Sequence, residues 1–147
     1  MTLVRKTFDL ARQVEPGLAG LKLIDGSTGA CRISLLRGRL QPGAIHSPHT
    51  HDVEESVVFL SGTGVVEIGG LRSEIQPGDA ILVAPGVIHS TFNTGSEDLW
   101  FVAAYPSNQI TANTDPTGSS KPTIVHWSGV RNRIAWALRR VADRISA

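Results

Sequence analysis

An all-β sandwich or barrel is the fold class that the sequence predicts, and three observations favour it. The 147 residues include 15 glycines and 8 prolines, which are scattered among short apolar runs. Turn residues therefore recur at short intervals, which is typical of many short strands rather than of a helical bundle. Two of these runs flank Gly69-Gly70, a strong hairpin signal because the central positions of such a turn need positive φ. At this length, one domain with its own core is the simplest organisation.

The strands are expected between the turn signals. Residues 1–30 show one candidate strand, at 21–24, before the turn dipeptide Asp25-Gly26. Further strands are expected at 31–40, 56–60, 65–68, 71–75, 80–83, 88–92 and 99–105, each bounded by Gly, Pro, Asn or Ser. Cys31 lies in the first of these runs and is expected to be a small buried hydrophobe.

The chain changes character after residue 105. Residues 1–105 are expected to form the β domain, residues 106–123 a flexible linker rich in Ser, Thr, Asn, Pro and Gly, and residues 124–147 a basic amphipathic helix. The apolar residues of this helix would share a stripe of about 80° at the helical period: Val130, Ile134, Leu138, Val141 and Ile145. We expect the helix to dock on its own barrel or on a second subunit; an acidic partner or a membrane surface is the alternative.

Composition restricts the function classes. The net charge of +1 does not indicate nucleic-acid binding. The single cysteine allows no internal disulfide, and no segment has the length or apolarity of a signal peptide or a membrane span. We therefore expect a cytoplasmic protein.

One stretch, residues 43–62, carries the chemistry. His49 and His51 are two residues apart, so on an extended strand both imidazoles point to the same face, and the Glu55 carboxylate follows within reach. Imidazoles suit Zn, Cu, Fe and Ni, and a carboxylate widens the choice to Mn and Co. The pattern predicts the beginning of a site for one divalent transition-metal ion.

The spacings in this stretch and in a second one resemble the two motifs of the cupins, a family of small β-barrel proteins. In the first motif, Gly43 and Gly62 frame His49, His51 and Glu55. The second reads from Gly78 through Pro85, Gly86 and His89 to Asn93, with Ala84 at the usual proline position. The resemblance covers residues 43–93 and leaves both terminal regions outside it.

The resemblance implies a double-stranded β-helix (jelly-roll) barrel in which His49, His51, Glu55 and His89 are the metal ligands. Three nitrogens and one oxygen leave open positions on a five- or six-coordinate ion, which a catalytic site needs. Small cupins of this kind are commonly homodimers, so a homodimer is expected.

Other residues are weaker candidates. His46 and Tyr105 could act as acid–base groups, although His46 more simply reads as a surface loop residue. Phe59 shares the parity of Glu55 and could line a substrate pocket, as could Trp100, but ordinary core packing explains Phe59 equally well. Glu54 should face solvent, and Asn93 should stabilise a turn.

The resemblance implies a metal-dependent enzyme that acts on a small oxygen-rich substrate such as an enol, a diketone, a hydroxy acid or a polyketide-like molecule. Dioxygenase-type oxidation is the preferred reaction. Redox-silent isomerase, cyclase or lyase chemistry is the first alternative. A non-enzymatic small-molecule-binding module is the second, and the complete ligand set favours an enzyme over it.

Overall fold

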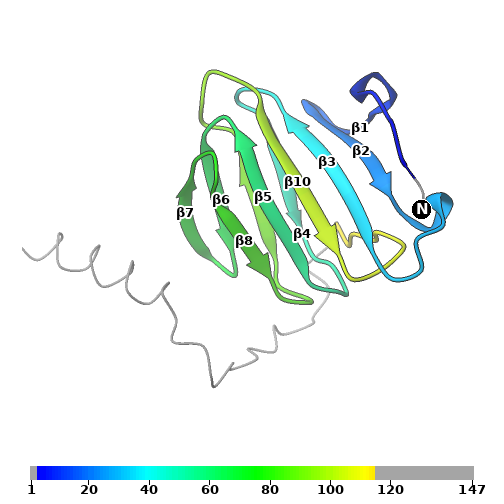
Figure 1. Ribbon diagram of the computed structural model, residues 1–147. Coiled ribbons are helices and arrows are strands. Elements are labelled where there is room, and N and C mark those ends of the chain that lie inside the picture. Colours follow the sequence, from blue (N-terminus) through cyan, green and yellow to red (C-terminus); the bar gives the residue numbers. More distant parts are fainter. Residues whose placement is uncertain (1–2, 115–147) are drawn as a thin grey trace, which may run out of the picture.

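Two antiparallel sheets face each other in the computed structural model, which describes residues 3–114. Six strands form one sheet in the order β1-β2-β3-β10-β5-β8, and four form the other in the order β4-β9-β6-β7. Figure 1 shows the first sheet in front, with β4 seen behind β10. This arrangement confirms the expected all-β jelly-roll.

The elements follow one another along the chain as short strands and two 3₁₀ turns. They are η1 (Phe8–Leu10), β1 (Arg12–Glu15), β2 (Leu18–Ile24), η2 (Gly26–Thr28), β3 (Ser34–Leu40), β4 (Ile45–His49), β5 (Glu55–Ser61), β6 (Gly64–Ile68), β7 (Leu71–Ile75), β8 (Ala80–Val83), β9 (His89–Phe92) and β10 (Leu99–Tyr105).

The core lies between the two sheets because alternate side chains of each strand point inward. On β10 every second residue from Leu99 to Tyr105 is buried, and on β5 every second residue from Glu55 to Phe59 is buried. Glu55 therefore shares a face with the apolar core residues Val57 and Phe59. The same alternation that builds the core also delivers a carboxylate to one end of it.

The Gly69-Gly70 hairpin is confirmed. β6 and β7 pair from Gly64↔Ile75 to Ile68↔Leu71, and the two glycines between them have φ of 59° and 83°. Positive φ at both central positions is the requirement that made this dipeptide a hairpin signal.

Asn93 stabilises a turn, as expected. Its buried side-chain amide donates to the Leu40 and Glu97 carbonyls, at 2.8 Å each, and its Oδ1 accepts from the Gly95 N–H at 3.0 Å.

The N-terminal region holds more structure than the sequence indicated. β1 pairs with β2 at the edge of the larger sheet, and η1 precedes it (Figure 1). Cys31 was expected to be buried in a strand, but it is exposed, because β3 begins only at Ser34. Glu54 is exposed, as expected.

Residues 106–114, the described part of the expected linker, are held by specific hydrogen bonds. The Ser34 hydroxyl donates to the Ser107 carbonyl at 2.6 Å, and the Gly26 N–H donates to the Asn108 carbonyl at 2.8 Å. Thr50 and Asn113 exchange two backbone hydrogen bonds of 3.0 and 2.9 Å. We name residues 107–113 the return segment, because it runs back to the end of β4. The expected helix at 124–147 lies outside the described residues.

Candidate metal centre

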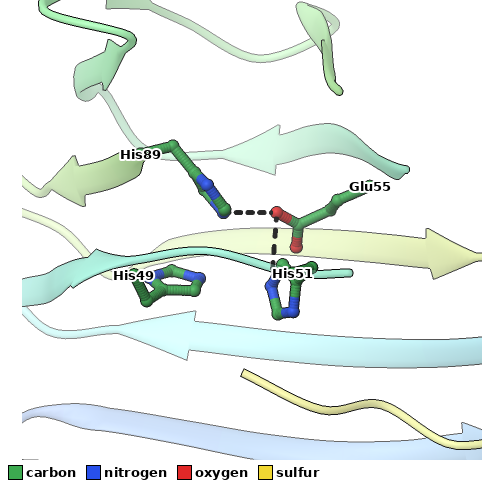
Figure 2. A group of neighbouring side chains, drawn as sticks. All are labelled: His49, His51, Glu55 and His89. Carbon is green, nitrogen blue, oxygen red and sulfur yellow. Dashed lines mark ion pairs between the residues drawn. The ribbon is translucent and has the colours of Figure 1, made fainter. Parts of the chain in front are cut away.

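Four buried side chains, three from strands and one from the loop after β4, meet at one end of the core. His49 ends β4, His51 follows two residues later, Glu55 begins β5 and His89 begins β9. Their exposed fractions are 2, 5, 4 and 5%, and one ligand atom from each lies within 4.8 Å of the others. Figure 2 shows the Glu55 carboxylate between His89 and His51, with His49 beside them. The structure therefore brings together the four residues that the sequence nominated.

Backbone carbonyls fix the tautomer of each histidine. The Nδ1 atoms donate to the carbonyls of Ser47 (from His49, 2.7 Å), Thr111 (from His51) and Val87 (from His89, 2.9 Å). With the proton on Nδ1, the lone pair of each ring lies on Nε2. Within the described residues, none of the three buried Nε2 atoms makes a hydrogen bond, although that of His89 lies 2.8 Å from Glu55 Oε2.

This arrangement fits a transition-metal ion. Metal–nitrogen and metal–oxygen bonds of about 2.0–2.2 Å place neighbouring ligand atoms about 3 Å apart and opposite ones about 4 Å apart. Here Glu55 Oε2 lies 2.8 Å from His89 Nε2 and 3.8 Å from His51 Nε2. Buried imidazole nitrogens with no protein partner are otherwise costly, and a bound cation would satisfy all three.

Burial and neighbouring groups hold His49 and Glu55 in the protonation states that bind a metal ion. Burial, reinforced by the neighbouring His89, lowers the pKa of His49 to about 4, so its imidazole is neutral at pH 7. Burial opposes ionisation of Glu55, but the adjacent His89 and the hydrogen bond from Tyr105 outweigh it and lower the pKa of Glu55 to about 2. At neutral pH the cluster thus presents a neutral His49 imidazole and the Glu55 carboxylate.

Tyr105 belongs to this site. Its buried hydroxyl donates to Glu55 Oε1, and its ring lies 5.0 Å from that of His51. Burial and the adjacent Glu55 carboxylate raise the pKa of Tyr105 well above its usual value of 10, so the phenol keeps its proton. Tyr105 is therefore a proton-bearing group in direct contact with one ligand of the cluster.

His46 also reaches the cluster, contrary to the expectation of a surface loop. It lies on β4, and its ring packs against that of His49 with centroids 4.0 Å apart. A bulge is the cause, because His46 pairs with Thr91 and His49 with His89, which leaves an extra residue on β4. Burial, together with the nearby His49, lowers the pKa of His46 to about 3.

The two aromatic pocket candidates lie elsewhere. Phe59 is 1% exposed and packs in the core between the sheets, with its ring centroid 6.4 Å from that of Phe101. Trp100 precedes buried Phe101 on β10, so its side chain points to the opposite face of the sheet. Its ring packs on Phe8 of η1 and on the Arg37 guanidinium, so the structure does not bring Trp100 to the cluster.

Sequence reasoning missed Ser47, Thr111 and Val87, whose carbonyls accept from the ligand imidazoles, and Glu15, which hydrogen-bonds Ser47. Ser47 and Thr111 act through backbone carbonyls, which leave no trace in residue type. Glu15 binds Ser47 from β1. One signal was available, since Pro48 within a strand indicates an edge or a bulge.

Comparison with known proteins finds a family match over the middle of the chain. Residues 36–105 match the family described as the cupin domain. A dimethylsulfoniopropionate lyase, DddW of Ruegeria pomeroyi, is 33% identical over 91 residues, which cover 61% of this chain and 59% of the lyase. The chain thus spans less than two thirds of that relative.

Solved structures share the fold at lower identity. The polyketide cyclase RemF of Streptomyces resistomycificus is 24% identical, with a TM-score of 0.64 over 76% of this chain and 84% of the cyclase. The oxalate decarboxylase of Lactobacillus farciminis is 24% identical, with a TM-score of 0.63 over 69% of this chain and 32% of the decarboxylase. In the described residues, no helix is long and apolar enough to cross a membrane. The family match, together with the jelly-roll and the buried three-histidine, one-glutamate cluster, identifies residues 36–105 as a cupin domain.

Proposed function

We propose that this protein is a metal-dependent enzyme in which His49, His51, Glu55 and His89 hold one divalent transition-metal ion. One observation carries the proposal: three buried Nε2 atoms with fixed tautomers converge on a carboxylate and have no hydrogen-bond partner in the described chain. The donor set suits Fe, Mn, Co, Ni, Cu or Zn. Four protein ligands leave room for a substrate on a five- or six-coordinate ion.

The substrate class follows from this donor set. When bound, the ion supplies a Lewis acid that coordinates carboxylate or carbonyl oxygens and stabilises negative charge developing on them. His46, His49 and Tyr105 are uncharged at neutral pH, so these three side chains add no charge repulsion toward an anionic substrate. A small molecule with a carboxylate or paired oxygens is the expected ligand.

The reaction we favour is lyase chemistry: removal of a proton next to the carboxylate and loss of a β-substituent. The C–H electron pair forms the new C=C bond, and the leaving group departs with its own bonding pair. Tyr105 is our choice of acid–base group, because its hydroxyl contacts the ligand Glu55: its oxygen would take the substrate proton as its own proton passes to Glu55 Oε1. His46 is the second proton carrier, but its Nε2 faces Glu15 at 3.7 Å. The relative DddW, whose name describes a lyase acting on a small sulfonium carboxylate, supports this choice.

Dioxygenase-type oxidation is the second candidate and uses the same four ligands. It would require a redox-active ion and O₂, and its substrates would be enols or diketones. The two reactions differ in a measurable way, since the lyase consumes no oxygen.

The test is a substrate panel on protein loaded in turn with Fe, Mn, Co, Ni, Cu and Zn. The panel contains β-substituted propionates, including dimethylsulfoniopropionate, and diketones; alkene products are followed by NMR and oxygen uptake by an electrode. We expect an alkene product without oxygen uptake. Metal-saturated Tyr105→Phe should lose about 10²–10⁴-fold in kcat, the usual contribution of a general acid–base group.

Ser34→Ala is the matched control. Ser34 pairs with Tyr105 across β3 and β10, and its buried hydroxyl bonds to the Ser107 carbonyl rather than to the cluster, so in metal-saturated protein kcat should fall far less than in Tyr105→Phe. Oxygen uptake with a diketone and no elimination would replace the lyase by the dioxygenase. Metal-loaded protein that binds panel compounds without turning over any of them would overturn the enzyme proposal in favour of a binding module.

A further inference from the structure

Strand β4 is irregular just before the ligand His49. The bulge between His46 and His49 interrupts its pairing with β9, and Pro48 has no N–H to give to a ladder. Ser47, between them, needs another partner for its backbone, because an unpaired N–H in a partly buried position is costly.

Glu15, on β1, supplies that partner. The Ser47 N–H donates to both carboxylate oxygens of Glu15, at 3.2 Å each, and the Ser47 hydroxyl donates to Oε2. His46 Nε2 lies 3.7 Å from Oε1 of the same carboxylate. The Glu15 side chain is only 23% exposed, so this contact is partly shielded from water. One carboxylate therefore hydrogen-bonds Ser47 and lies beside His46, the residue that precedes it in the bulge.

Ser47 and His46 both contact His49. The Ser47 carbonyl accepts the Nδ1–H of His49 at 2.7 Å, and the His46 ring packs against the His49 ring. Because Pro48 follows, the backbone of Ser47 is restricted to extended conformations. With its N–H also held by Glu15, Ser47 has little freedom to turn its carbonyl away from His49.

We propose that Glu15 is a positioning residue for the metal ligand His49. It lies outside the matched cupin domain at 36–105, so the N-terminal hairpin is part of the metal centre. The proposal rests on metal binding at the cluster, but its effect on His49 exists before any metal binds. Loss of a group that orients a ligand typically lowers metal affinity by about 10–100-fold.

The test compares Glu15→Ala, Glu15→Asp and Glu15→Gln, with Gln13→Ala as the control for damage to β1, since Gln13 is exposed on the same strand. Affinity for Co²⁺ is measured by chelator competition on full-length protein. Alanine lacks the acceptor, and aspartate is one methylene shorter, so both should weaken binding about 10–100-fold. Glutamine keeps an acceptor at the same reach and should stay within about threefold, as should Gln13→Ala.

Comparing Glu15→Asp with Glu15→Gln separates positioning from charge. Aspartate keeps the negative charge but is expected to weaken Co²⁺ binding, whereas glutamine loses the charge but is expected to bind Co²⁺ almost like wild type. A second readout needs no metal: long-range ¹H–¹⁵N spectra of the metal-free protein should show His49 as the Nδ1–H tautomer in wild type and Glu15→Gln, and as a tautomer mixture in Glu15→Asp. Glu15→Asp with wild-type affinity and an unchanged His49 tautomer would overturn the inference. If wild-type protein binds no Co²⁺, the proposed function fails, and the spectra still decide the role of Glu15.

Discussion

Replacing Tyr105 by phenylalanine removes one hydroxyl that contacts the ligand Glu55 and leaves the ring in place. In the wild type this hydroxyl donates to Glu55 Oε1. A hydrogen bond to an ionised group contributes about 1.5–3 kcal/mol, against about 1 kcal/mol for a neutral one. We therefore expect metal-free Tyr105→Phe to be about 2 kcal/mol less stable than wild type at pH 7.

The pKa of Glu55 sets the pH dependence of this loss. Its folded-state pKa of about 2 lies below the usual 4.5, which corresponds to about 3 kcal/mol of folding free energy at pH 7. Because the folded pKa is the lower one, this stabilisation is present above pH 4.5 and is lost as the pH falls from 4.5 to 2. The cost of Tyr105→Phe should accordingly shrink to about 1 kcal/mol near pH 2, where Glu55 becomes protonated.

Urea unfolding of chelator-treated protein at pH 7 and pH 2 follows this decrease. Ser34→Ala serves as the control, because it removes a buried neutral hydrogen bond to a carbonyl and should cost about 1 kcal/mol at both pH values. A cost for Tyr105→Phe below about 0.5 kcal/mol at pH 7, or one that does not change with pH, would refute the reasoning that ties Tyr105 to the ionised Glu55.

Three further results are expected. Gly38→Ala should destabilise the fold by about 1–3 kcal/mol or more in thermal unfolding, because the added Cβ would lie 2.1 Å from the Phe101 ring; an unchanged Tm would contradict this packing. Asn113→Pro removes the N–H that bonds to the Thr50 carbonyl and should loosen the return segment that orients His51, which lowers Co²⁺ affinity about tenfold; equal affinity would show that the segment is dispensable. Light scattering should give twice the 15.7 kDa chain mass for the expected homodimer, and a monomer mass would rule the dimer out.

Most of the fold could be predicted from local sequence patterns. Strands ended by glycine or proline were predictable because turn chemistry is local, as at Gly69-Gly70. The ligands His49 and His51 were predictable from their spacing of two, and the motif pattern supplied His89. These predictions depended only on backbone geometry and residue type.

The surroundings of the ligands were less predictable. The bulge at Pro48 shifts the parity of β4, and this shift carries His46 to the cluster. Thr111 holds His51 with a backbone carbonyl from 60 residues away, a contact that any residue type could make. The face to which Trp100 points was not predictable, because it depends on the strands that pair with β10. Those strands, β3 and β5, come from distant parts of the chain.

The metal content of the protein, purified without chelator and measured by elemental analysis, tests the central claim most directly. We expect about one transition-metal ion per wild-type chain, from one divalent ion bound by four ligands, and at most about a tenth of that in His89→Ala, because a three-ligand remnant loses most of its affinity. Wild-type protein that carries no metal and takes up none when metal is added, or a His89→Ala variant that binds metal like wild type, would contradict the proposed metal centre.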